Sequence, residues 1–203
     1  MKEHLVLVPG IDGTGHLFCR QIPELETRFT VTATRLRDDV ERMEELVRDL
    51  DDEISRVAGA RRVTLLGESF SGARALSYAL AHPERIDRLV ILNSFAHLGS
   101  QVRLWLGYHL LRATPWGMMR IVGQLVAGRM HSPTTDRDEV RQCLELMRTT
   151  TREGYLSRMR ILRSYDIRAQ LPAPAPGLHL GDILDDWMAR RSAGRGDAAR
   201  AHR

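Results

Sequence analysis

The segment RVTLLGESFSGARAL, residues 62–76, is the most informative part of the sequence, because it joins an apolar run to a helical pattern with a single serine between them. The run is rich in β-branched and leucine side chains, which is typical of a strand covered on both faces of a sheet. Residues 70–82 then have a helical pattern. The sequence therefore predicts a strand that passes through a tight turn at Ser69 directly into a helix.

Three similar runs predict three more strands at residues 4–8, 29–35 and 88–94. Between the second and third strands, apolar side chains recur at spacings of three and four, and Gly59 marks the end of the helix that they predict. These side chains are Val40, Met43, Val47, Leu50, Ile54 and Val57. Alternation of strands and helices indicates an α/β fold with a mostly parallel, doubly wound sheet.

The alternation of strands and helices stops after residue 95, because residues 100–170 contain helical patterns and no convincing strand. We expect a helical cap inserted over the sheet, followed by a fifth strand at residues 176–181. The predicted divisions are a core sheet with both candidate loops at 1–99, the helical cap at 100–170, a return to the core at 171–187 and a basic tail at 188–203.

Composition narrows the function classes. A chain of 203 residues with 43% hydrophobic residues suits one domain. No signal peptide is expected at the start, and no apolar run approaches the roughly 18 residues of a membrane span, so we expect a soluble cytoplasmic protein. Cys19 and Cys143 are isolated, which excludes a zinc or disulfide framework and predicts buried thiols.

The net charge of +4 is the charge of the tail alone, where five arginines and one aspartate follow Met188. This segment has no interleaved aromatic residues and no apolar periodicity. A solvated, disordered end is therefore expected rather than a phosphate-binding arm, and nucleic acid is not an expected partner.

A glycine-rich turn, PGIDGTGHLF at residues 9–18, follows the first strand. Its glycines depart from the spacing of a dinucleotide-binding loop, and the second strand ends in basic residues instead of an acid. A phosphate loop of the Gly-Lys-Ser/Thr type is also absent from the sequence. No organic cofactor or metal ion is predicted.

The turn at Ser69 has the features of a nucleophile elbow. Such a turn needs small residues two positions before and after the serine, and Gly67 and Ser71 occupy these places. Ser71 stands where the strict motif has its second glycine. The N–H of Phe70, with an N–H from the turn after the first strand, could stabilise an oxyanion. The alternative is a serine in a merely structural turn.

These two motifs resemble the α/β hydrolases. LVPGIDGTGHLF and LLGESFSGARALSYALAHPERIDRLVILNSF are similar to the esterase and acyltransferase branch that includes phytyl ester synthase-like proteins, over roughly residues 4–181. The resemblance implies that Ser69 is the nucleophile and that the N–H groups of Ile11 and Phe70 form the oxyanion hole. It also implies that the helical insertion is the cap of the family.

By the same resemblance, an acid and then a histidine should follow the cap. A strand at residues 178–180 puts Asp185 at the acid position, with Asp182 as the alternative, although the same residues also suit an ordinary acidic start of a helix. The family histidine would follow one more strand, and only His202 remains there. His16 and His97, which follow predicted strands, are the candidates for a substitute base.

The sequence therefore predicts a serine hydrolase that acts on a small carboxylic ester or thioester through an acyl-enzyme on Ser69. Transfer of the acyl group to an alcohol would make it an acyltransferase instead. Because the resemblance stops where the composition changes, a truncated or frame-shifted, catalytically inactive binding fold is the other hypothesis. Acyl-chain length and oligomeric state stay open at this point.

Overall fold

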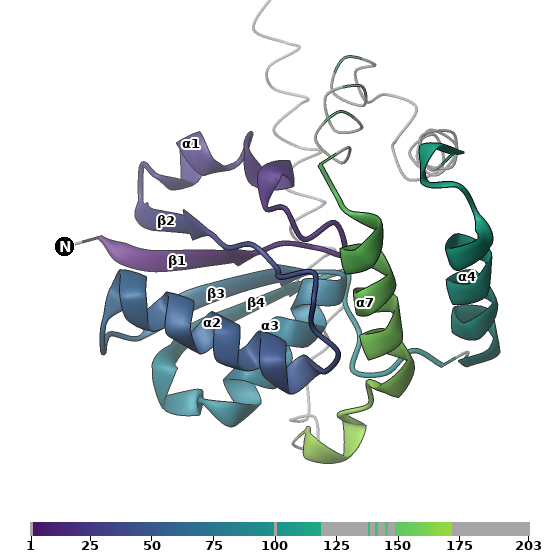
Figure 1. Cartoon of the computed structure of the whole chain (residues 1–203). Coiled ribbons are helices and arrows are strands. Elements are labelled where there is room, and N and C mark those ends of the chain that lie inside the picture. Colours follow the sequence, from purple (N-terminus) through teal and green to yellow (C-terminus); the bar gives the residue numbers. More distant parts are fainter. Residues whose placement is uncertain are drawn as a thin grey trace, which may run out of the picture. The chain divides into compact units, whose positions relative to one another are not determined.

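The computed structural model describes residues 2–99, 101–118, 138, 141, 145 and 149–171 (Figure 1). The elements are, in chain order, β1 (Glu3–Val8), η1 (His16–Phe18), α1 (Ile22–Leu25), β2 (Phe29–Ala33), α2 (Met43–Ala58), β3 (Val63–Glu68), α3 (Phe70–Ala81), η2 (Pro83–Arg85), β4 (Ile86–Leu92), α4 (Gln101–Ala113), η3 (Trp116–Met118), α7 (Arg152–Ser164) and η4 (Arg168–Gln170). The described residues up to Ala169 belong to one compact unit, which contains the whole sheet.

Within the described residues, four parallel strands form a sheet in the order β2-β1-β3-β4. β1 is central, and its residue Leu5 pairs with Val31 on one side and Thr64 on the other. Parallel strands require crossover connections: α3 connects the neighbours β3 and β4, and α2 connects β2 to β3 across β1. The predicted parallel α/β sheet with its four strands is confirmed. The loops that follow the strands consequently gather at the carboxyl edge of the sheet.

The sheet is covered on both faces, as the apolar strands predict. Leu5 and Leu7 pack against Phe18 of η1 and the apolar side chains of α1. Val6 and Val8 are fully buried and project from the opposite face, because successive side chains of a strand alternate. That face is covered by α2 and α3 (Figure 1). The hydrophobic core therefore fixes the positions of the strand ends.

The second helix, α2, forms where the apolar spacing predicts it. Its buried side chains lie on one face and are Met43, Leu46, Val47, Leu50, Ile54 and Ala58. Glu44 and Glu45 occupy its first turn, where the helix dipole favours negative charge. The helix ends at Gly59, whose φ of 60° suits a residue without a Cβ.

Two helices of the region predicted as a cap, α4 and α7, pack against each other (Figure 1). The contact is close at Gly107, where an added Cβ would lie 3.6 Å from the Met159 methyl group. Helices are thus confirmed in this part of the predicted insertion, while the division into core, cap, return and tail stays a prediction. The predicted strand at 176–181 and the basic tail at 188–203 lie outside the described residues.

The prediction for Cys19 was wrong, because its side chain is exposed. Cys19 directly follows η1, in which the neighbouring Phe18 takes the inward position against the sheet. Cys143 lies outside the described residues. In the part of the chain that the structure describes, no helix combines the length and the apolar character that crossing a membrane requires.

Candidate active site

Ser69 forms a one-residue turn between β3 and α3. Its φ of 55° and ψ of −122° lie in a region that residues other than glycine rarely adopt. Among the described non-glycine residues, positive φ values occur only at Ser69 and Asn93. The Ser69 N–H donates to the Leu92 carbonyl at 3.0 Å, and its own carbonyl accepts from the Gly72 N–H at 3.1 Å and from Ser94 Oγ at 2.7 Å. The turn is therefore held from both β4 and α3.

The residues around this turn are small because neighbouring atoms leave no room. A Cβ on Gly67 would lie 2.8 Å from the carbonyl carbon of Ser71 and 2.9 Å from Ala75 Cβ. A Cβ on Gly72 would lie 2.5 Å from Ser94 Oγ. Ser71 itself is fully buried. The departure from the strict motif is tolerated because the close approach to Ser94 falls on Gly72 and not on Ser71.

The glycine loop after β1 folds back on itself. The Gly13 N–H donates to the Gly10 carbonyl at 3.0 Å, which closes a four-residue turn. Gly13 and Gly15 both have a φ of 74°. The buried Asp12 carboxylate accepts from the Thr14 N–H at 2.9 Å and from Thr14 Oγ1 at 2.5 Å. Backbone amides in this loop are thus held in fixed directions.

Among the backbone hydrogen bonds that the described residues make outside helices and strands, none is donated by the N–H of Ile11 or of Phe70. Ile11 follows β1 and Phe70 follows β3, and these strands are neighbours in the sheet. Phe70 is the first residue of α3, so its N–H carries the positive end of the helix dipole. Such donors at one sheet edge can stabilise a negatively charged oxygen.

Three consecutive threonines before α7 contact the loops at this edge. Thr149 Oγ1 lies 3.5 Å from His16 Nδ1, Thr150 Oγ1 donates to the Asp12 carbonyl at 3.3 Å, and Thr151 Oγ1 donates to Asp38 Oδ2 at 2.6 Å. Thr151 also caps α7, since its Oγ1 accepts from the Gly154 N–H. The start of α7 is thereby joined to the loops after β1 and β2.

The α/β hydrolase fold model matches residues 3–114, which is more than half of the chain and includes both the glycine loop and the Ser69 turn. The chain belongs to the α/β hydrolase fold family. The resemblance that the two motifs suggested is confirmed at the level of the family.

A curated relative, the carbamate hydrolase RutD of Caulobacter sp. (strain K31), whose name marks that activity as provisional, is 27% identical over 103 residues. The match covers 47% of this chain and 38% of the relative, so the chain spans well under half of that protein. Similar solved structures include a hydrolase from Pseudomonas aeruginosa PA01, which is 24% identical, with 83% of this chain and 67% of that chain covered and a TM-score of 0.71. They also include an enol-lactonase from Burkholderia xenovorans LB400, which is 20% identical, with 84% of this chain and 68% of that chain covered and a TM-score of 0.71. At these identities they are evidence for the fold alone.

Glu68 and Tyr155 of this α/β hydrolase both lie within electrostatic reach of the Asp12 carboxylate. Partial burial, together with the nearby Asp12 carboxylate, raises the pKa of Glu68, the residue before Ser69. Burial, and then the same carboxylate, raises the pKa of Tyr155, which belongs to α7. The Tyr155 ring also lies 6.4 Å from the Trp116 ring, between centroids. Burial and the Asp12 carboxylate therefore both favour the uncharged forms of Glu68 and Tyr155.

Among the described residues, no hydrogen bond joins Ser69 to either described candidate for the base. His16 lies in the glycine loop, where its Nδ1 is 3.5 Å from Thr149 Oγ1. His97 follows β4, and its Nδ1 lies 3.5 Å from Asp166 Oδ2. The positions predicted for the acid, Asp185 and Asp182, and for the base, His202, lie outside the described residues. Of the site residues predicted from sequence, the structure thus describes Ser69, Phe70, Ile11 and the two candidates for a substitute base, His16 and His97.

In the part of the chain that the structure describes, no group of three histidine, cysteine, aspartate or glutamate side chains could hold a metal ion.

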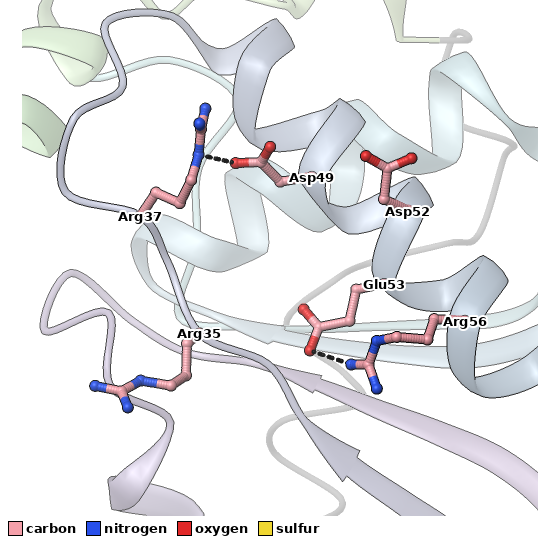
Figure 2. A pocket seen from close by; sticks show the side chains of 6 residues that line it. All are labelled: Arg35, Arg37, Asp49, Asp52, Glu53 and Arg56. Atoms are coloured by element: carbon pink, nitrogen blue, oxygen red, sulfur yellow. Dashed lines mark hydrogen bonds and ion pairs between the residues drawn. The ribbon is translucent and has the colours of Figure 1, made fainter.

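A hollow of about 350 Å³ lies between α2 and the loop after β2 (Figure 2). Its lining residues are Arg35, Arg37, Asp49, Asp52, Glu53 and Arg56. Arg37 pairs with Asp49 at 2.9 Å and Arg56 with Glu53 at 3.5 Å. Because acids and arginines are balanced there, the hollow offers no net charge for a ligand, and it contains no part of the Ser69 turn.

Sequence reasoning missed Ser94, Thr150 and Arg158, which all touch the backbone of the two loops. Ser94 lies in the turn after β4, where a small polar residue is common. Arg158 did leave a signal, because it lies on the same helical face as Gly154 and Ile161, both of which are buried. A charged residue on the apolar face of a helix indicates a specific buried partner.

Proposed function

We propose that this chain is a serine hydrolase that cleaves carboxylic esters or thioesters through an acyl-enzyme on Ser69. The observation that carries the proposal is the backbone of Ser69, held at a φ of 55° between β3 and α3 by three hydrogen bonds. A turn of this kind lifts the serine oxygen above the sheet edge. Strain of roughly 1–3 kcal/mol at such a residue persists only where the surrounding structure determines it.

In the proposed reaction, Ser69 Oγ attacks the carbonyl carbon while a base takes its proton. The negative charge that develops on the carbonyl oxygen is stabilised by the N–H groups of Ile11 and Phe70. Collapse of this intermediate expels the alcohol or thiol, which takes the proton from the base. Water then adds to the acyl-serine in the same way and releases the carboxylic acid.

The proposal keeps Asp185 as the acid that orients the base. General-base assistance is worth roughly 100- to 10,000-fold in rate, so the identity of the base decides how active this chain is. The substrate is assigned to the acyl class because a carbamate and an enol-lactone, which appear in the names of two similar proteins, both contain a carbonyl bonded to a heteroatom.

Labelling with a fluorophosphonate probe tests the proposal, because the probe phosphonylates an activated serine. The wild-type chain and Ser71→Ala should be labelled, whereas Ser69→Ala should not. Ser71→Ala is the matched control, since it removes a hydroxyl two residues away in the same turn. A folded wild-type chain that takes up no label would contradict the proposal and favour a non-catalytic binding fold.

Hydrolysis of p-nitrophenyl esters of increasing acyl length then defines the substrate class. Release of nitrophenol should depend on Ser69 in the same way as the labelling. Formation of a new ester when an alcohol is added, in preference to the free acid, would assign the chain as an acyltransferase.

A further inference from the structure

Arg158 of α7 reaches the backbone of the proposed oxyanion loop from a buried position. Its side chain is 1% exposed. Nη1 donates to the Ile11 carbonyl at 3.2 Å, and Nη2 donates to Asp38 Oδ1 at 2.7 Å. Asp38 is held in turn by Thr151. One guanidinium thus joins the loop after β1 to the loop after β2.

This contact fixes the peptide that follows Ile11, and a second contact fixes the peptide that precedes it. The carbonyl of Ile11 accepts from Arg158, while the carbonyl of Gly10 accepts from the Gly13 N–H at 3.0 Å. Each peptide group is planar, so holding its oxygen also sets the direction of its N–H. The Ile11 N–H lies in the plane of the Gly10 carbonyl, so the Gly13 contact sets its direction directly. The Arg158 contact holds the next plane and so restrains rotation about the Ile11 backbone.

The loop and helix are built around the guanidinium. A Cβ on Gly13 would lie 2.5 Å from Arg158 Cζ, and a Cβ on Gly154 would lie 2.8 Å from its Nη1. The Arg158 Nε is buried without a hydrogen-bond partner in the described part of the chain. Burial lowers the pKa of Arg158, and the Asp38 carboxylate opposes that shift.

If the only role of Arg158 were to stabilise the fold, an apolar side chain could fill its place with a smaller desolvation penalty. Arg158 is buried, whereas the side chain of its partner Asp38 is 38% exposed, so solvent screens the pair while the guanidinium loses its hydration. The pair by itself is therefore weak evidence for a role in stability. The bidentate geometry of arginine, in contrast, can hold a carbonyl and a carboxylate at the same time.

We propose that Arg158 is a positioning residue that holds the Ile11 N–H ready to donate to the oxyanion. The inference rests on the proposed function, since it assigns a role to Ile11 in that reaction. Arg158 itself does not touch the reacting atoms. It acts through the loop after β1, and in this way α7 helps to support the site.

The test compares the rate of phosphonylation of Ser69 by a fluorophosphonate in wild type, Arg158→Met and Arg158→Lys. Small misplacement of a positioned group can cost about 100-fold, so Arg158→Met should lower the maximal labelling rate about 10- to 100-fold with little change in the probe concentration at half-maximal rate. Arg158→Lys should recover part of the rate, because one ammonium can hold the Ile11 carbonyl.

Arg160→Met is the matched control on the same helix, since Arg160 is half-exposed and its only described ion pair is with Glu41 at 3.5 Å. It should be labelled at the wild-type rate. Should Arg158→Met not fold, Thr150→Val removes the other anchor of the same loop, and its labelling should slow several-fold. A wild-type labelling rate in a folded Arg158→Met, or in Thr150→Val in that case, would overturn the inference.

Hydrogen exchange separates this inference from the proposed function, because it does not depend on activity. In Arg158→Met, amides of residues 10–15 should exchange at least about tenfold faster, while those of α2 stay unchanged. Unchanged exchange in the loop would overturn the positioning role even where labelling falls. A wild type without label would overturn the proposed function, and faster loop exchange would then still support the contact between Arg158 and the loop.

Discussion

Ser94 Oγ donates a hydrogen bond of 2.7 Å to the carbonyl oxygen of Ser69, and this bond joins the turn after β4 to the turn after β3. The same Ser94 side chain lies where a Cβ on Gly72 would have to go. Ser69 has a positive φ, and a residue in such a conformation stays there only when its neighbours hold it. Ser94 is therefore part of what keeps the proposed nucleophile in place.

Ser94→Ala should weaken the turn without disrupting the sheet. Loss of one hydrogen bond costs about 1 kcal/mol of the free energy of unfolding, which urea titration measures. Labelling of Ser69 should also slow several-fold, because its backbone is less restrained. Ser164→Ala is the control, since Ser164 Oγ donates to the Ile161 carbonyl at 3.1 Å far along α7. It should change stability little, because alanine suits a helix better than serine does, and it should keep the labelling rate. Equal labelling rates in both variants would argue against the role of Ser94.

Gly67→Ala should be strongly destabilising. The added methyl group would overlap the backbone of Ser71 and lie 2.9 Å from Ala75 Cβ, and neither can move without shifting α3. Forcing extra volume into a packed site costs about 1–3 kcal/mol, and a clash with backbone belongs at the upper end of that range. Gly117→Ala is the control, because nothing lies within 4 Å of its new Cβ. Urea midpoints that agree for the two variants would contradict the close packing.

The sheet and the Ser69 turn could be predicted from sequence because their signals are local. A strand and a helix each show their own periodicity, and the turn between them is marked by Gly67 and Gly72 within a few residues of Ser69. The same reasoning identified the glycine loop, since positive φ at Gly13 and Gly15 requires that residue type.

The support from α7 could not be predicted, because Arg158 and Ile11 are far apart in sequence and meet only once the chain has folded. Local patterns say that Arg158 lies on a buried face, but they do not identify the carbonyl to which it donates. Cys19 was misplaced for a related reason, since its exposure depends on Phe18 taking the inward position. The acid and the base predicted at Asp185 and His202 stay predictions.

The Asp166 carboxylate should make stability depend on acidic pH. It accepts from the backbone N–H, Nε and Nη2 of Arg168, at 3.2, 2.9 and 2.7 Å, and these bonds hold its pKa well below the usual range. Its pKa is lower in the folded than in the unfolded chain. Both side chains are largely exposed, so solvent screens the pair and its effect on stability is small. The stabilisation is present above the unfolded value of about 3.9 and is lost as the pH falls further.

Urea midpoints measured from about pH 6 down to about pH 2.5 check this dependence. The midpoint of the wild type should fall more steeply below about pH 4 than that of Asp166→Asn, which keeps an acceptor but has no charge to neutralise. Arg168→Met should flatten the profile in the same way, because it removes the cause of the lowered pKa. Parallel profiles for all three proteins would show that this pair does not govern the acid sensitivity.

Ser71→Ala should stabilise the protein. The Ser71 side chain is fully buried in the first turn of α3, and its hydroxyl has no hydrogen-bond partner among the described residues. An unsatisfied buried hydroxyl costs about 1–3 kcal/mol, and alanine fits the same space without it. We expect the free energy of unfolding to rise by about 1 kcal/mol, measured by urea titration, with Ser69 labelling unchanged.

Ser71→Gly is the informative comparison, because it restores the strict motif but weakens the helix by about 1 kcal/mol relative to alanine. A Ser71→Gly variant that is more stable than Ser71→Ala would mean that the turn does require glycine at this position.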